Sequence, residues 1–147
     1  MHTDTCRKER FQSFENGLAL LRQALARGPA ALNPLEKEGA IRRFEYCLDL
    51  AWKAAKEFLE DSGLRIAPVT PREVLRQAAA AGVLAEGQVW IDMLDHRNLI
   101  GHNYDGVVLA EVSEALSARY FPAMEQLREF LAVTEVDGAR ASVDSEL

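Results

Sequence analysis

The side chains with the most chemistry in this chain are gathered in one short segment, residues 97–104, whose sequence is RNLIGHNY. Arg97 supplies a permanent planar cation that can hold a phosphate group through paired hydrogen bonds. His102 can gain or lose a proton near neutral pH, and Tyr104 carries a hydroxyl that can donate, accept or be modified. The segment therefore predicts phosphate chemistry, and no other part of the sequence concentrates as many reactive groups.

The positions of these side chains around a helix decide whether they can act together. In a predicted helix that ends at Ile100, apolar residues such as Trp90 lie on one side, and Arg97 falls within that arc at about 100° per residue. A buried unpaired guanidinium is costly, so Arg97 needs an anion, a carboxylate or a polar cleft. On an unbroken helix His102 would lie about 140° around the axis from Arg97. We therefore expect the helix to end within two residues of Gly101, which could turn His102 toward the arginine.

A structural interpretation of the same residues stays open. Arg97 would then pair with a carboxylate, His102 would cap a helix C-terminus, and Tyr104 would fill a loop against the core. Asp92 and Asp95 are near Arg97 in sequence but lie off the apolar arc. We expect them to be surface acids rather than its partners.

Other residue types that often carry function receive a structural interpretation. Trp52 and Trp90 are expected in the core or an interface rather than as platforms for base stacking. His2 and His96 have no companions that would make them ligands or bases. The two cysteines are too few for a disulfide framework, and no Cys/His spacing resembles a zinc site.

The composition limits the class of protein. The chain has 147 residues, 48% of them hydrophobic, which suits one domain with an ordinary core. No apolar stretch approaches the roughly 20 residues of a membrane-spanning helix. Residues 1–10 lack the apolar centre of a secretion signal. The net charge of −6 argues against a general nucleic-acid coat. We expect a cytoplasmic protein that meets any nucleic acid only locally.

Apolar residues recur at steps of three and four along most of the chain, which predicts helices. The first stripe occupies residues 11–25 and must end before the Gly-Pro pair that follows. Residues 33–36 and 70–73 each supply an N-cap residue, a proline and a glutamate, in the pattern of a capping box. They open a long second helix that ends near residues 62–63 and a short third helix that ends near residues 81–82.

The second half of the sequence predicts two more helices. The fourth runs from about residue 86 to 100, and the fifth from about residue 106 to 133 with Asp105 as its N-cap. Pro122 lacks a backbone N–H and clashes with the preceding turn, so we expect a kink or a break near residues 118–121.

These patterns predict an all-α fold, an up-and-down bundle of four to five helices. No alternating stretch is long enough to predict a strand. The bundle is expected as a single domain over residues 1–134, and the loss of pattern beyond it predicts a frayed C-terminal tail at residues 135–147.

Arg97, His102 and Tyr104 follow the pattern of an arginine, four residues, a histidine, one residue and a tyrosine. This pattern resembles the signature of HEPN-domain proteins. More narrowly, residues 11–131 are similar to the HepT-type toxins, also described as nucleotidyltransferase substrate-binding proteins. That family consists of small helical bundles that form homodimers, and many members are metal-independent ribonucleases. The resemblance implies a homodimer with two motifs around a shared cleft, RNA as substrate, and no cofactor or metal.

The resemblance also implies a role for each motif residue. Arg97 and His102 would be catalytic, and Tyr104 would be the modified position. HepT-type toxins are encoded beside a minimal nucleotidyltransferase, MntA, which acts as antitoxin and transfers AMP from ATP to the motif tyrosine. The implied function is that of the toxin in a type VII toxin-antitoxin system. Two alternatives stay open: a noncatalytic subunit that presents a substrate or nucleotide to the nucleotidyltransferase, and a purely structural helical dimer.

The residue types agree with such a reaction. Metal-free RNA cleavage can use the neighbouring 2′-OH as nucleophile, and it needs a base, an acid and positive charge near the phosphorus. A two-fold dimer would supply two copies of His102 for the proton transfers, while Arg97 holds the phosphate. The product would be a 2′,3′-cyclic phosphate. AMP on Tyr104 would add negative charge and bulk beside these cations, which would inactivate the site.

Overall fold

The computed structural model describes residues 2–102 and 105–146, and those residues form helices and loops without a strand. The predicted all-α fold is confirmed. None of the described helices combines the length and the apolar character needed to cross a membrane. In chain order the elements are α1 (His2–Leu25), the short 3-10 helix η1 (Pro29–Ala31), α2 (Pro34–Asp61), α3 (Pro71–Ala80), α4 (Gly87–His102), α5 (Gly106–Ala115), η2 (Leu116–Tyr120) and α6 (Phe121–Glu146).

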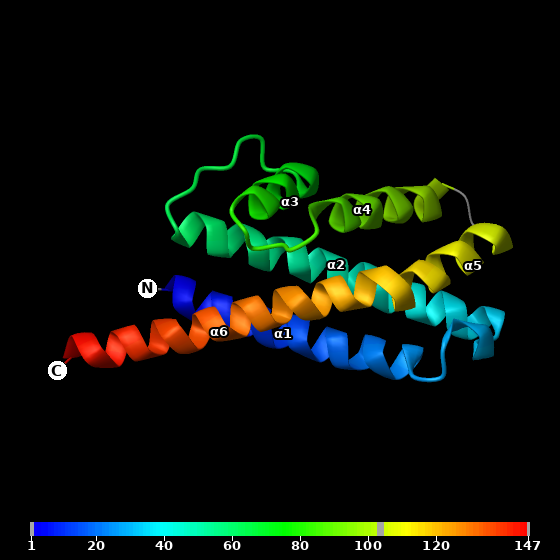
Figure 1. Cartoon of the computed structure of the whole chain (residues 1–147), viewed down its shortest axis with the longest axis horizontal. Helices are drawn as coiled ribbons and strands as arrows, with labels where there is room; N and C mark the ends of the chain where they lie inside the picture. Colours follow the sequence, from blue (N-terminus) through cyan, green and yellow to red (C-terminus); the bar gives the residue numbers. More distant parts are fainter. Residues whose placement is uncertain (1, 103–104, 147) are drawn as a thin grey trace.

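The long helices α1, α2 and α6 run side by side along the long axis of the molecule (Figure 1). Helix α3 packs against the C-terminal half of α2, and α4 follows α3 along the same side of the bundle. Helix α5 then returns the chain from the end of α4 to the long α6. As a result, the end of α4 lies at the opposite end of the bundle from both chain termini.

The predicted caps start the helices where the sequence indicates. Asn33 and Glu36 form a reciprocal capping box at the start of α2, in which each side chain accepts from the other residue's backbone N–H, at 2.8 and 3.0 Å. The Thr70 hydroxyl accepts from the backbone N–H of Glu73 at 3.2 Å and caps α3. The Asp105 carboxylate accepts from the backbone of α5 at 3.0 Å. The Thr70 and Asp105 caps fix the starts of α3 and α5, the helices before and after α4.

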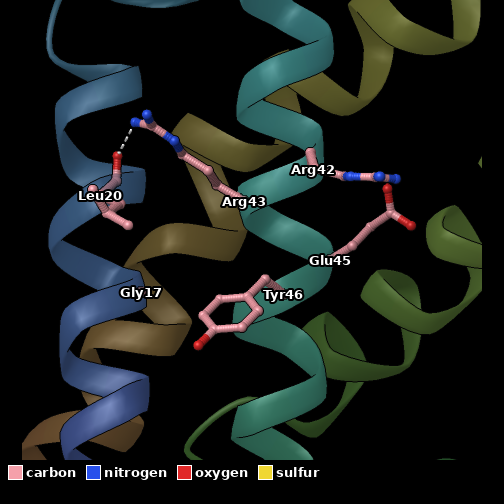
Figure 2. Close-up of a pocket in the computed structure, with 6 residues that line it drawn as sticks. All are labelled: Gly17, Leu20, Arg42, Arg43, Glu45 and Tyr46. Carbon is pink, nitrogen blue, oxygen red and sulfur yellow. Dashed lines mark hydrogen bonds between the residues drawn. The ribbon is translucent and has the colours of Figure 1, made fainter.

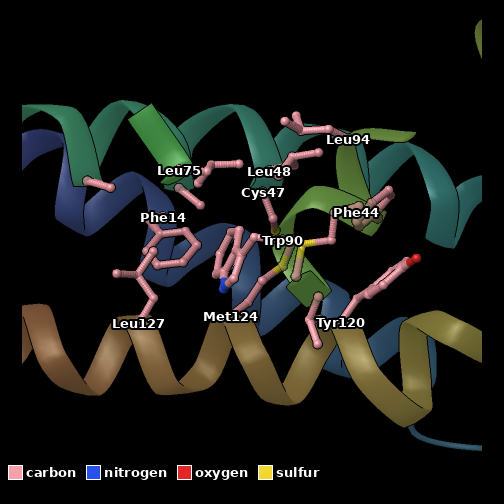
Figure 3. Packing of buried hydrophobic residues seen from close by; sticks show 14 of the residues in the cluster. Phe14, Phe44, Cys47, Leu48, Leu75, Trp90, Leu94, Tyr120, Met124 and Leu127 are labelled. Carbon is pink, nitrogen blue, oxygen red and sulfur yellow. The ribbon is translucent and has the colours of Figure 1, made fainter. Parts of the chain in front are cut away.

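Large apolar side chains fill the space between the helices (Figure 3). Trp90 of α4 is fully buried at the centre, and Trp52 packs at the edge of the same core, as expected for both tryptophans. Phe14 reaches the centre from α1. The rings of Phe44 and Tyr120 stack with their centroids 5.6 Å apart. The first half of α4 is therefore held by apolar contacts on several sides.

The bend predicted near Pro122 takes the form of a π-helical segment. In η2 the backbone N–H of Phe121 donates to the carbonyl of Leu116, five residues earlier. Because proline has no N–H, the carbonyl four residues before Pro122 loses its usual helical donor, and the wider turn accommodates that change. Helices α5, η2 and α6 thus follow one another as a continuous, bent helix (Figure 1).

Helix α6 continues beyond the last apolar stripe. The sequence predicts a frayed tail at residues 135–147, whereas the described backbone is helical to Glu146. The segment combines alanine, arginine and glutamate, which favour helical backbone, with glycine, valine, serine and aspartate, which favour it less. The domain boundary at residue 134 and the frayed tail both stay predictions.

Candidate active site at the end of helix α4

Helix α4 carries two of the three predicted site residues near its C-terminus. The described part of the helix runs to His102, and the prediction that it ends within two residues of Gly101 falls partly on residues 103–104, outside the described residues. Its buried residues confirm the apolar arc on which Arg97 was placed: Val89, Trp90, Met93, Leu94 and Ile100. Tyr104 lies outside the described residues, so its predicted role stays a prediction.

Arg97 is half-buried on this arc, and in the described part of the chain its guanidinium has neither a hydrogen-bond nor an ion-pair partner. The structural alternative, in which Arg97 pairs with a carboxylate, is therefore not realised within residues 2–102 and 105–146. An exposed cation would be satisfied by water, but a half-buried one gains from a bound anion. The side chain is thus available to a negatively charged group.

The two nearby carboxylates bind other arginines. Asp92 Oδ2 accepts from Arg119 Nη2 at 2.6 Å, and Asp95 Oδ1 accepts from Arg72 Nη2 at 2.6 Å. Hydrogen bonds from Arg119 and Gln88 hold the pKa of Asp92 below its usual value. The expectation that both acids are surface groups rather than partners of Arg97 is confirmed.

His102 is exposed and is the last described residue of α4. Gly101 keeps helical backbone and has no positive φ, so the chain does not turn His102 toward Arg97. Glycine permits a departure from helical geometry but does not force one. The expected swing of the histidine is therefore absent, and within one chain the two side chains project about 140° apart around the helix.

A polar cluster beside the motif was missed in the sequence. His96, expected to have no companions, places Nδ1 2.5 Å from the Tyr120 hydroxyl and Nε2 3.4 Å from Glu111 Oε1. Burial raises the pKa of Tyr120 to about 12, so its hydroxyl stays protonated and can donate. The partners of His96 lie 15 and 24 residues away in sequence, and no local pattern marks them.

A shallow groove on another face, about 490 Å³ in volume, lies between α1 and α2 (Figure 2). A side chain at Gly17 would meet the Tyr46 ring at 3.2 Å, so glycine allows this close contact between the helices. Arg43 Nη1 is already bonded to the backbone carbonyl of Leu20 at 2.7 Å. The groove contains none of the motif residues, and it is lined by Gly17, Leu20, Arg42, Arg43, Glu45 and Tyr46. It adds no chemistry to the site on α4.

Residues 9–133 match a family described as nucleotidyltransferase substrate binding protein like. A Haemophilus influenzae protein named probable ribonuclease HepT is 29% identical over 98 residues, which covers 62% of this chain and 66% of that protein. The match thus spans slightly less than two thirds of the relative's length. Both names agree with the resemblance that the motif indicates.

Two solved structures share the architecture. One is a crystal structure of a Thermus thermophilus protein, 33% identical, with a TM-score of 0.67 over 78% of this chain and 94% of that chain. The other is a Haemophilus influenzae protein described as having the fold of a substrate binding domain of a nucleotidyltransferase. It is 22% identical, with a TM-score of 0.59 over 87% of this chain and 98% of that chain, and so shows the fold alone.

Proposed function

The chain belongs to the family of nucleotidyltransferase substrate binding protein-like proteins, and we propose that it is a metal-independent endoribonuclease within that family. Arg97 carries the proposal, because it is a half-buried cation without a partner in the described part of the chain. An RNA phosphate matches its charge and its planar fork of donors. The relative named probable ribonuclease HepT supports the same activity.

In the proposed reaction Arg97 holds the scissile phosphate and stabilises the charge that develops on the phosphorane. One copy of His102 takes the proton from the adjacent 2′-OH, whose oxygen then bonds to phosphorus. The bond from phosphorus to the 5′-oxygen breaks, and that oxygen receives a proton from a protonated histidine. The products are a 2′,3′-cyclic phosphate and a 5′-hydroxyl.

The separation of Arg97 and His102 supports a site made by two chains. Within one chain the two residues lie on different sides of α4, so a second copy is needed to surround one phosphate from both sides. Leu99 is 40% exposed and Val107 is 74% exposed, and both flank the motif in sequence. Exposed apolar side chains beside a polar site are typical of surfaces that a partner covers. We therefore expect a homodimer with both motifs at one cleft.

We further propose that Tyr104 is the control point and that the chain is the toxin of a cytoplasmic toxin-antitoxin pair. Its phenol oxygen would attack the α-phosphate of ATP on an MntA-like nucleotidyltransferase, with pyrophosphate leaving. The attached AMP would place a negative charge beside Arg97 and His102 and compete with RNA. Mass spectrometry should then show AMP added to the wild-type chain and to Tyr46→Phe but not to Tyr104→Phe; equal labelling of all three would contradict the assignment.

The ribonuclease itself is tested with purified protein, RNA and excess chelator. We expect cleavage by the wild-type chain and by Arg43→Ala, whose arginine lies in the groove between α1 and α2. Arg97→Ala and His102→Ala should lose it, because they lack the phosphate ligand and the proton-transfer group. Cleavage by both site variants at the wild-type rate would rule out the site.

A second function is favoured by one specific observation. The matched family and a solved structure with this fold are both described in terms of substrate binding for a nucleotidyltransferase. In that case the chain would present a nucleotide or substrate to its partner without cutting RNA. Wild-type protein that leaves RNA intact, yet changes the activity of an MntA-like nucleotidyltransferase, would favour this function over the first.

A further inference from the structure

The cluster of His96, Tyr120 and Glu111 joins three helical segments one residue before Arg97. Tyr120 of η2 is fully buried, while the His96 side chain on α4 is 17% exposed. The Tyr120 hydroxyl lies 2.5 Å from His96 Nδ1, and the rings meet edge to face with centroids 5.6 Å apart. Glu111 of α5 makes the longer 3.4 Å contact on the other ring nitrogen. The cluster therefore links α4 to both segments that follow it in the chain.

The direction of these hydrogen bonds is assigned from the two contacts of the His96 ring taken together. We assign His96 the Nε2–H tautomer, in which the Tyr120 hydroxyl donates to Nδ1 at 2.5 Å. That Nε2–H points at the Glu111 carboxylate. One tautomer of His96 thus satisfies both neighbours, and the ring is fixed at two points.

A second contact ties the same two segments together. Arg119, the residue before Tyr120, donates to Asp92 at 2.6 Å, and its guanidinium lies 5.7 Å from the centroid of the Tyr120 ring. Asp92 and His96 are four residues apart, so both face η2 from the same side of α4. Adjacent residues of the π segment therefore hold adjacent turns of α4.

Beyond His96 no comparable contact holds α4. Among its described residues after His96, no side chain has a hydrogen bond to another element, and Ile100 alone is buried. Arg97 and His102 are therefore placed by the direction of the helix itself, which the core contacts of α4, the Arg72–Asp95 pair and the contacts with η2 set together.

We propose that Tyr120 and His96 are positioning residues, which set the rotation of α4 about its axis and thereby the directions in which Arg97 and His102 project. The inference rests on the proposed ribonuclease function. A displacement of about 1 Å in a catalytic group can lower a rate by a factor of about 100. Loss of a single hydrogen bond between η2 and α4 is therefore expected to lower the rate of RNA cleavage, although neither residue contacts the RNA.

Tyr120→Phe tests this directly, because the ring that stacks on Phe44 stays and the hydroxyl is removed. The matched control is Ser113→Ala, which removes a buried hydroxyl bonded at 2.8 Å to the Leu109 carbonyl within α5. We expect kcat of Tyr120→Phe to fall roughly 10- to 100-fold with KM almost unchanged, and kcat of Ser113→Ala to match wild type. A wild-type kcat in Tyr120→Phe, or an equal loss in both variants, would overturn the proposal.

Two further readouts separate positioning from general damage. In ¹⁵N NMR spectra, His96 should be the Nε2–H tautomer in wild type and a mixture in Tyr120→Phe; a mixture in wild type would contradict the hydrogen-bond order. His96→Asn keeps an acceptor near the position of Nδ1 and should retain more of kcat than His96→Leu. Equal losses would show that the acceptor has no role.

Hydrogen exchange keeps this inference distinguishable from the ribonuclease proposal. In Tyr120→Phe the amides of residues 97–102 should exchange faster than in Ser113→Ala, because the last turns of α4 lose their nearest anchor. If the wild-type chain cuts no RNA, the ribonuclease proposal fails, whereas the exchange rates still decide the role of Tyr120. Unchanged exchange in Tyr120→Phe would overturn the positioning role.

Discussion

The two halves of helix α4 differ in how their polar side chains are bonded. Before the motif, Asp92 binds Arg119 and His96 binds Tyr120, both in the π segment η2. After His96, Arg97 is half-buried and His102 is exposed, and neither has a polar partner in the part of the chain that the structure describes. The contacts of the first half fix the position of the helix. The charged side chains of the second half remain available to a ligand from outside the chain. A site for an anion is the simplest explanation of that division.

The largest effect that separates the two halves should come from Arg97→Ala. Loss of a group that stabilises charge in the transition state lowers kcat/KM by roughly 100- to 1,000-fold. The melting temperature should stay equal or rise, because the substitution removes a half-buried cation without a partner. RNA cleavage and thermal unfolding measured on the same preparation check both parts. A lower melting temperature would mean that Arg97 supports the fold rather than binding an anion.

In the first half of α4, a smaller effect is expected from Tyr120→Phe, on the free energy of unfolding. Removing the hydroxyl leaves Nδ1 of the mostly buried His96 without its donor, which costs about 1–2 kcal/mol in the free energy of unfolding. Tyr46→Phe is the control, because Tyr46 is 54% exposed and water can satisfy its hydroxyl. Urea denaturation of both variants measures the difference. If Tyr120→Phe and Tyr46→Phe were equally stable, the Tyr120–His96 hydrogen bond would not stabilise the first half of α4.

The smallest effect should come from Asp92, which lies nearer the surface than His96. Arg119 and Gln88 lower the pKa of Asp92 in the folded chain, so its stabilising contribution is present above the unfolded pKa and is lost as the pH falls through the lowered folded pKa. Exposed ion pairs contribute up to about 1 kcal/mol. Denaturation midpoints measured from pH 6 downward should therefore fall less steeply for Asp92→Asn than for wild type. If the midpoints of wild type and Asp92→Asn fell in parallel with pH, the Asp92–Arg119 pair would contribute nothing to stability.

The features that could be predicted from the sequence are those fixed by neighbours in the chain. Asn33 and Glu36 lie within one helical turn of each other, and their capping box is observed as predicted. The spacing of apolar residues alone predicts that Arg97 lies on the buried side of α4, and its partial burial agrees with that prediction. Local spacing is enough in both cases, because the helix itself determines which residues meet.

The features that the sequence missed depend on contacts between distant segments. His96 meets Tyr120 across 24 residues, and the π turn sets the direction from which Tyr120 approaches. Such a turn shifts the register by one residue relative to an α-helix, so a regular helical repeat misplaces the side chains after it. The helix break expected at Gly101 is not observed, for a different reason. Glycine allows a break, but nothing at that position requires one.

We propose that Arg97 and His102 cut RNA through its own 2′-OH, and the ends of the products test this mechanism most directly. A short RNA incubated with the wild-type chain in excess chelator should yield fragments with a 2′,3′-cyclic phosphate by mass spectrometry. A matched RNA with 2′-O-methyl groups throughout should stay intact, and Arg97→Ala should leave both RNAs whole. Cleavage of the methylated RNA, fragments with a 3′-hydroxyl, or the same fragments from Arg97→Ala would contradict this mechanism.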